Sequence, residues 1–162
     1  MLLSNSGFGQ MIELTSLTGR YLKQMIEELK VQSDPDGAAA TLLDSIDLIV
    51  PHQANKTMII KLAGDAGLTP DQLYFNIESV GNTSAASIPL AIADAKADGV
   101  LKEPVRIFAP GFGAGAVGGY AVLRIDPAVI ADESTPTESA DLATNPTAAV
   151  PTSSDNVQVA FG

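Results

Sequence analysis

Apolar residues recur every three or four positions through residues 10–30, which predicts an amphipathic helix with one apolar stripe. The same spacing predicts helices over residues 53–66 and 84–99, and Gly67 stands where the second helix would be capped. Pro89 must lie in the first turn of the third helix or kink it. The pattern therefore indicates three helices separated by shorter segments.

Four short apolar runs between and after these helices predict β-strands, at residues 45–50, 73–77, 105–109 and 119–125. The order is helix, strand, helix, strand, helix, strand, strand. Strands joined by a helix should run parallel with right-handed crossovers, and the closing hairpin adds an antiparallel strand. The predicted fold class is α/β, with a mixed, mostly parallel sheet, layered helices and a C-terminal β-hairpin.

The pattern ends near residue 126. From residue 127 onward the chain consists of alanine, serine, threonine and proline with scattered acids, and it has too few large apolar side chains to offset the entropy of ordering. We therefore predict a domain over residues 1–126 and a disordered acidic tail over 127–162. The alternative is a tail that binds the domain through Val157, Val159 and Phe161.

Composition narrows the classes of function. The 162 residues are 46% apolar, enough for a core, and carry a net charge of −10, which argues against duplex nucleic acid or an anionic membrane as the main partner. The chain has no cysteine, so it contains no disulfide, no cysteine–zinc site and no cysteine nucleophile of its own. We see no secretory signal and no bilayer-spanning apolar run, so we expect a cytoplasmic protein.

Polar or glycine-rich segments follow three of the predicted strands, at residues 51–55, 80–84 and 110–119. In open α/β sheets, ligands bind outside the carboxyl ends of the parallel strands. We therefore expect these three segments to meet at one edge of the sheet and to form the functional site.

The candidate side chains in these segments have structural and functional interpretations. His52, the only histidine, is either a structural residue or a catalytic one, and it has too few companions for a metal site. Asn82 is either a turn residue after Gly81 or a neutral amide donor to an oxyanion. The glycine-rich segment precedes a strand instead of a helix, so it lacks the helix N-terminus that a dinucleotide phosphate needs.

Three motifs together are similar to one family. Asp-Leu-Ile-Val-Pro-His-Gln-Ala-Asn at 47–55, Gly-Asn-Thr-Ser-Ala-Ala-Ser-Ile-Pro at 81–89 and Gly-Phe-Gly-Ala-Gly at 111–115 closely resemble the C-terminal half of β-ketoacyl-ACP synthase III, a thiolase-like condensing enzyme. The resemblance covers roughly residues 8–126. It implies one of two similar α/β halves of a five-layer α-β-α-β-α subunit that normally dimerises.

The resemblance also implies a reaction, a decarboxylative Claisen condensation of acyl-CoA with malonyl-ACP in fatty-acid or polyketide synthesis. A cysteine in the N-terminal half accepts the acyl group. His52 and Asn82 match the histidine and asparagine that stabilise the enolate. The hairpin at Gly113 and Ala114 matches the segment that donates a backbone N–H to the acyl oxyanion.

Binding residues follow from the same resemblance. Asn55 matches a residue near the pantetheine arm of CoA, and Phe112 matches the aromatic side chain beside the cysteine. Thr57 departs from the family at a position where an arginine often binds the carrier protein. The remaining candidates for that docking role are Lys56, Lys61 and Arg20. No cofactor is implied, because the CoA and ACP phosphopantetheine thioesters are substrates.

Three accounts of the absent half remain open. The chain is a split or truncated enzyme that needs a cysteine-bearing N-terminal half, an incomplete fragment without catalysis, or a non-catalytic scaffold subunit that pairs with a complete synthase protomer. We favour the first account. In it the isolated chain is inactive, and the active form is a dimer or hetero-oligomer. Its partners are then that half, acyl-CoA and the acyl carrier protein.

Overall fold

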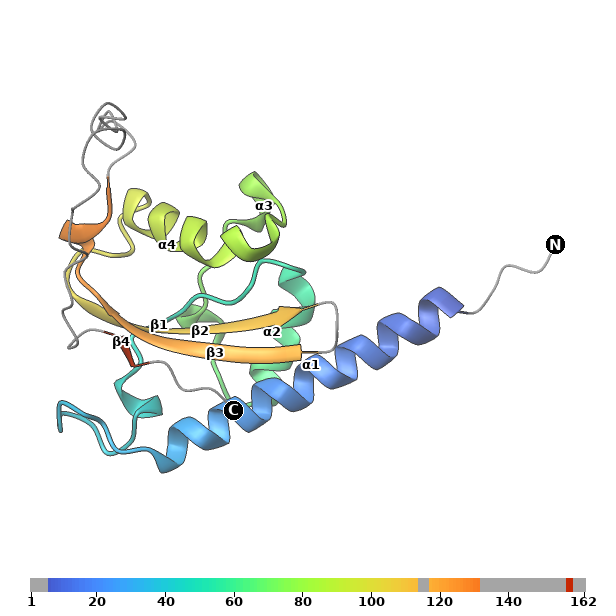
Figure 1. Cartoon of the computed structure of the whole chain (residues 1–162), viewed down its shortest axis with the longest axis horizontal. Coiled ribbons are helices and arrows are strands. Elements are labelled where there is room, and N and C mark those ends of the chain that lie inside the picture. Colours follow the sequence, from blue (N-terminus) through green and yellow to red (C-terminus); the bar gives the residue numbers. More distant parts are fainter. Residues whose placement is uncertain (1–5, 114–116, 132–156, 159–162) are drawn as a thin grey trace, which may run out of the picture.

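Helices cover both faces of a small sheet (Figure 1). The computed structural model describes residues 6–113, 117–131 and 157–158, with side chains described in 16–113 and 117–131. One face carries two helices, α1 (Ser6–Val31) and α2 (Lys56–Asp65). The other face carries α4 (Ser87–Ala97), with the single turn α3 (Ile77–Val80) beyond its beginning. The domain is thus layered α/β/α, as the sequence predicts.

The sheet has the order β1-β2-β3-β4. Its strands are β1 (Leu48–Ile49), β2 (Val105–Gly113), β3 (Val117–Ile125) and β4 (Val157–Gln158). β1 runs parallel to β2, whereas β2 with β3 and β3 with β4 are antiparallel. The sheet is therefore mixed, and its parallel part is shorter than the sequence predicts.

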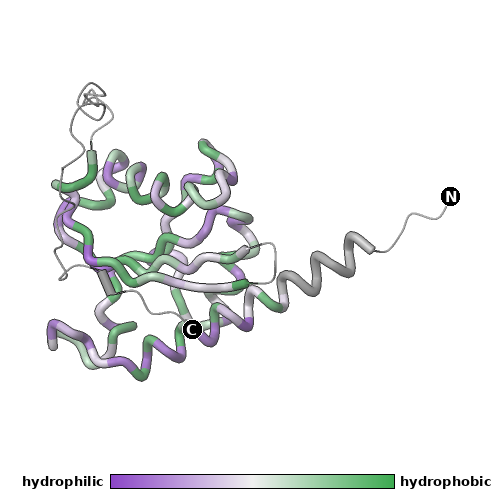
Figure 2. The backbone as a smooth tube through the Cα atoms, in the orientation of Figure 1, coloured by the Kyte–Doolittle hydropathy of each residue, from purple (hydrophilic) through white to green (hydrophobic). Residues whose placement is uncertain are grey.

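The two halves of the core follow the alternation of side chains along the strands. Leu48 and Ile107 face α4, and Ile49 and Phe108 face α1 and α2. Phe108 is fully buried and meets the ring of Tyr120 edge-on, with the centroids 5.7 Å apart. Colouring by hydropathy shows that hydrophilic and hydrophobic residues alternate along the described part of α1, whereas much of β2 and β3 is white to green (Figure 2).

The predicted helices are present with shifted ends. α2 begins three residues later than predicted, at Lys56, because the Asn55 side chain accepts the Met58 N–H at 2.9 Å and caps the helix. Gly67 follows its end with φ +87°, the left-handed conformation that suits glycine there. Pro89 lies in the first turn of α4. None of the helices in the described part of the chain is long and apolar enough to cross a membrane.

The predicted strand over residues 73–77 is wrong. Only Leu73 bridges the sheet, in parallel with Ile49. The chain then leaves the ladder because the side chain of Gln53 accepts the Asn76 N–H, and the Asn76 carbonyl accepts N–H groups from the turn α3 that follows. Tertiary hydrogen bonds override the β-type sequence pattern here.

The C-terminal boundary also differs from the prediction. Packed structure continues past residue 126 into a 3₁₀ turn, Pro127–Val129, whose first residue is buried, and Ile130 packs against the α4 side of the core. β4 pairs with β3 through Gln158 opposite Val122. The rest of the predicted tail, 132–156 and 159–162, lies outside the described residues.

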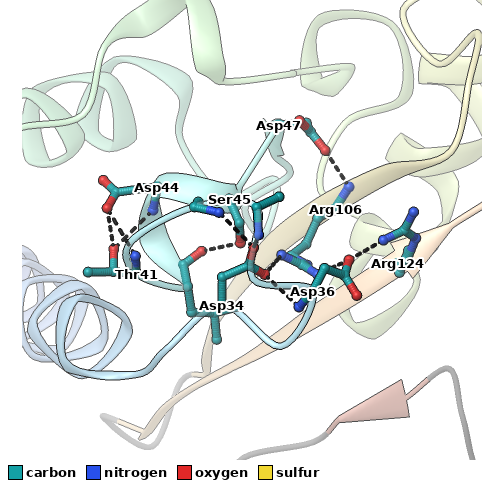
Figure 3. A network of polar contacts seen from close by, with 11 residues as sticks. Asp34, Asp36, Thr41, Asp44, Ser45, Asp47, Arg106 and Arg124 are labelled. Carbon is teal, nitrogen blue, oxygen red and sulfur yellow. Dashed lines mark hydrogen bonds and ion pairs between the residues drawn. The ribbon is translucent and has the colours of Figure 1, made fainter.

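A buried ion pair ties the turn after α1 to the sheet (Figure 3). Arg106 on β2 donates to Asp34 at 2.6 Å and to Asp36 at 2.7 Å, and its side chain is 9% exposed while that of Asp34 is fully buried. Arg124 on β3 also pairs with Asp36. The backbone N–H of Arg106 donates to Asp47 at 2.7 Å, so the same residue ties together three segments of the chain.

This network predicts that acid destabilises the folded protein. Burial alone would raise the pKa of Asp34. Four hydrogen bonds to its carboxylate outweigh burial and lower the pKa from 3.8 to about 2; the donors are the backbone N–H of Ala39, the Arg106 side chain and the backbone N–H groups of Asp36 and Ala38. The unfolded chain therefore takes up a proton that the folded chain does not. The stabilisation from Asp34 is complete above pH 3.8 and is lost as the pH falls toward about 2.

Urea unfolding at a series of pH values above and within this window tests the prediction. We expect the unfolding free energy to fall less steeply between pH 3.8 and about 2 in Asp34→Asn than in the wild type, because the variant lacks the titrating group. Equal slopes for the two proteins would show that other carboxylates account for the acid sensitivity.

Candidate functional site

The three segments predicted to form the site meet at one cavity of about 680 Å³. His52 from the segment after β1, Asn82 from the turn after α3, and Phe112 and Gly113 from the end of β2 all line it. Thr18 of α1 completes one side. The prediction that these segments converge is therefore confirmed, although Asn82 follows a helical turn and not a strand.

His52 is held by its backbone and by its ring. Its N–H donates to Pro110 O at 2.9 Å, which continues the β1–β2 ladder past the end of β1. Its Nδ1 lies 2.6 Å from the Oγ of Ser87 at the start of α4. Burial lowers the pKa of the half-buried imidazole below its ordinary value of 6.5. The ring is thus predominantly neutral at pH 7.

Gln53, the next residue, fixes the loop that carries His52. It is 1% exposed, and its Nε2 donates to Pro51 O at 2.7 Å while its Oε1 accepts the Asn76 N–H at 3.3 Å. Asn76 in turn donates to Asp94 of α4 at 2.7 Å. These buried hydrogen bonds tie the His52 loop to the segment before α3 and to α4, so the loop is rigidly placed.

Asn82 presents an amide donor at the surface of the cavity. The preceding Gly81 has φ +77°, which a residue with a side chain would adopt only under strain. The Oδ1 of Asn82 accepts the Ser84 N–H at 2.9 Å, and Nδ2 makes no hydrogen bond within the described residues. The amide is therefore oriented with its NH₂ group as the free donor.

Two of the three predicted hairpin residues line the cavity. Phe112 lines the cavity and also packs against the core on the α1 side of the sheet. Gly113 ends β2 opposite Val117, and it lines the cavity as well. Ala114, the predicted backbone donor, lies outside the described residues.

Apart from Phe112, the predicted binding residues lie beside the cavity or away from it. Asn55 caps α2 between two cavity-lining residues, and it does not line the cavity itself. Lys56 pairs with Glu78 at 2.9 Å, and Lys61 with Asp65 at 3.6 Å. The third candidate for carrier docking, Arg20, is exposed on α1.

Ser87 is the site residue that sequence reasoning missed. It is 2% exposed and contacts His52 across 35 positions of sequence. A small hydroxyl residue two positions before Pro89, in the first turn of a predicted helix, was the available signal. That signal has no unique meaning in the sequence, because helix N-termini often contain serine for capping.

The chemistry of the cavity is that of neutral donors. None of its lining residues within the described part of the chain is an aspartate, glutamate, lysine or arginine. An imidazole and an amide, both neutral donors, line a mostly apolar cavity that is open to solvent on one side. Fixed donors of this kind can stabilise negative charge that develops on an oxygen during a reaction.

Comparisons with known proteins identify the family of the chain. The family model of the 3-oxoacyl-[acyl-carrier-protein] synthase III C-terminal domain matches residues 37–125, more than half of the chain. A β-ketoacyl-[acyl-carrier-protein] synthase III of Nitratidesulfovibrio vulgaris is 43% identical over 82 residues, which are 51% of this chain and 25% of that protein. The corresponding protein of Clostridium acetobutylicum is 39% identical over 103 residues, or 64% of this chain and 31% of that one.

Solved structures give the same result. A 3-oxoacyl-(acyl-carrier protein) synthase of Burkholderia xenovorans matches with a TM-score of 0.59 and 32% identity, over 71% of this chain and 31% of that chain. A 3-oxoacyl-[acyl-carrier-protein] synthase III of Aquifex aeolicus matches with a TM-score of 0.57 and 30% identity, over 70% and 35% of the two chains. The present chain thus spans about a quarter to a third of its relatives' length. With its thiolase-like fold and its matching motifs, the chain belongs to the C-terminal-domain family of 3-oxoacyl-[acyl-carrier-protein] synthase III.

Proposed function

We propose that this chain supplies the oxyanion-stabilising half of a β-ketoacyl-ACP synthase III active site, which condenses the acyl group of acyl-CoA with malonyl-ACP. The observation that carries the proposal is the cavity in which His52, Asn82 and the end of β2 meet without a charged side chain among its described lining residues. Decarboxylation of a malonyl thioester places negative charge on a thioester oxygen, and neutral donors suit that charge.

The proposed reaction uses these groups in two steps. The bond between the malonyl carboxylate and its α-carbon breaks, carbon dioxide leaves, and the electron pair moves to the thioester oxygen to form an enolate. His52 Nε2–H and Asn82 Nδ2–H would hydrogen-bond that oxygen. The enolate carbon then attacks a cysteine-bound acyl thioester. The oxyanion of the resulting tetrahedral intermediate would accept a hydrogen bond from a backbone N–H of the hairpin at 113–114. The intermediate then collapses, and the cysteine thiolate leaves.

The cysteine must come from outside these 162 residues, which contain none. Two features support a cysteine-bearing N-terminal half as the partner. The chain spans only about a quarter to a third of its relatives, and apolar side chains are exposed on the elements beside the cavity, with Val80 39% and Leu90 41% exposed. The isolated chain would then be inactive, and the active form would be a dimer or hetero-oligomer.

The substrates of the proposed enzyme are thioesters, and no cofactor is needed. Fatty-acid synthesis and polyketide synthesis both use this condensation. We place the enzyme in the cytoplasm. For the acidic carrier protein, we assign docking to Lys56, Lys61 and Arg20. Asn55, at the start of α2 next to cavity-lining residues, is assigned to the pantetheine arm.

Reconstitution tests the proposal. The 162-residue chain would be co-expressed with a cysteine-bearing N-terminal segment, taken from the reading frame upstream of its gene or from a relative such as the Nitratidesulfovibrio vulgaris protein. We expect the two to co-purify, to transfer an acyl group from acyl-CoA to the cysteine and to release carbon dioxide from malonyl-ACP. Neither polypeptide alone should complete the condensation.

The control is the same pair with the partner's cysteine replaced by alanine, which should still assemble but should not become acylated. A homogeneous monomer of this chain that binds no such segment contradicts the split-enzyme proposal. A stable pair that neither acylates nor decarboxylates would favour a non-catalytic scaffold instead.

A further inference from the structure

Ser87 occupies a fixed position beside the imidazole of His52. It is the first residue of α4 and is 2% exposed. The helix is held against the sheet by Ala91 and Ala95, both fully buried in the core on that side. The Ser87 Oγ therefore cannot move far from His52 Nδ1, which lies 2.6 Å away.

The neighbouring hydrogen bonds assign a direction to this contact. The backbone N–H of Gln53 points to the same Oγ at 3.4 Å, and an N–H group can only donate. The Ser87 oxygen is thus the acceptor of that weak bond. Within the described residues the Ser87 hydroxyl hydrogen has one acceptor, His52 Nδ1, so we take Ser87 as the donor of this contact, which leaves the ring proton on Nε2.

We propose that Ser87 is a positioning residue that holds neutral His52 in the tautomer with the proton on Nε2, so that Nε2–H is the donor presented to the cavity. The inference rests on the proposed function in one respect, namely that the group which accepts this hydrogen bond is the thioester oxygen of the malonyl substrate. In the other tautomer Nε2 would present a lone pair, which repels an oxyanion. The Ser87 hydroxyl therefore fixes the orientation of the imidazole ring, and it keeps on Nε2 the proton that lets the ring stabilise a negative charge.

The surroundings of the ring leave this role to Ser87. The residues that line the cavity with His52 come from α1, the loop before α2 and α2 itself, the turn with Asn82, η3 (Ser84–Ala86), α4 and β2, and none of those described is acidic or basic. No carboxylate among the described lining residues is therefore available to hold a proton on Nδ1. The lowered pKa of His52, which burial causes, keeps the ring neutral at pH 7 and so makes the choice of tautomer decisive.

Nitrogen NMR of the imidazole tests the proposal on the full 162-residue chain. His52 is the only histidine, so its two ring nitrogens give the only imidazole signals. We expect Nε2 to carry the proton and Nδ1 to be an unprotonated acceptor in the wild type above the pKa of the ring. A proton on Nδ1 in the wild type would overturn the proposal, whatever any variant does.

Ser87→Ala removes the donor and should convert the single tautomer into a mixture with a clear population protonated at Nδ1. Ser87→Thr keeps a hydroxyl and should restore the Nε2–H tautomer if it folds. The control is Ser45→Ala, which removes a partly buried hydroxyl that donates to Leu42 O beyond the opposite end of β1, and it should leave the imidazole signals unchanged. An unchanged tautomer in a folded Ser87→Ala chain contradicts the proposal.

The turnover of the reconstituted pair separates this inference from the proposed function. We expect Ser87→Ala to slow malonyl decarboxylation by about tenfold or more, as when a group that orients a metal-bound imidazole is removed, and to spare acylation of the cysteine. A wild-type pair that has the predicted tautomer and no activity contradicts the proposed function alone. A normal decarboxylation rate in Ser87→Ala with a mixed tautomer contradicts the positioning role.

Discussion

Replacing His52 by alanine will slow malonyl decarboxylation by the reconstituted enzyme about 10²–10³-fold, the usual effect of losing one oxyanion donor. The acylation of the cysteine should be unchanged, because the proposed acyl oxyanion is held by the hairpin at 113–114 and not by the imidazole. Single-turnover release of carbon dioxide and mass spectrometry of the acylated cysteine measure the two steps separately. Loss of acylation instead of decarboxylation would mean that the role of His52 is misassigned.

A second variant at the same cavity sharpens this experiment. Asn82→Asp keeps the size of the side chain but replaces the free NH₂ donor with an oxygen, so decarboxylation should fall at least as far as in His52→Ala. Val31→Ala changes an exposed residue at the end of α1 and serves as the control for handling and assembly. Comparable rates in Asn82→Asp and in the wild type would remove Asn82 from the mechanism.

Replacing Phe108 by alanine will destabilise the domain by about 3–5 kcal/mol, the range for truncating a buried aromatic side chain. Phe108 is fully buried in the middle of β2, and it meets Tyr120 edge-on at 5.7 Å, so the variant loses both apolar burial and a ring contact. Urea unfolding followed by circular dichroism measures the change. A domain at the lower end of the usual stability range of about 5–15 kcal/mol would be largely unfolded after such a loss.

The control for this measurement is again Val31→Ala, because Val31 is 83% exposed and its truncation should change the unfolding free energy by less than about 0.5 kcal/mol. A loss of below about 1 kcal/mol in Phe108→Ala would mean that the neighbouring side chains collapse into the cavity, or that the core on the α1 side of the sheet is not formed in solution.

Elements with long, regular patterns were predicted well. The helix over 10–30 corresponds to α1, and the runs 105–109 and 119–125 correspond to the longer β2 and β3. Their periodicity reports directly on which face is buried, and burial dominates the energy of such elements. Their ends were less predictable because capping and ladder hydrogen bonds decide them, as Asn55 does for α2.

Short elements depend on contacts that the local pattern does not contain. Residues 73–77 resemble a strand in composition, but the buried amide of Gln53 removes Asn76 from the ladder. The convergence of His52 and Asn82 was nevertheless predicted, because both segments emerge at the same edge of the sheet. The hydrogen bond between Ser87 and His52 was not predicted, because no local sequence pattern links two residues 35 positions apart.

The ion pair of Arg106 with Asp34 has a consequence for synthesis of the protein on the ribosome. The two residues are 72 positions apart, and β1 likewise forms its parallel ladder with β2, apart from the single bridge to Leu73. At about 5–20 residues per second, the apolar face of α1 and the turn that follows it wait several seconds for the strand that completes them. Nascent chains that stop before β3 ends at Ile125 should therefore remain unfolded and prone to aggregation.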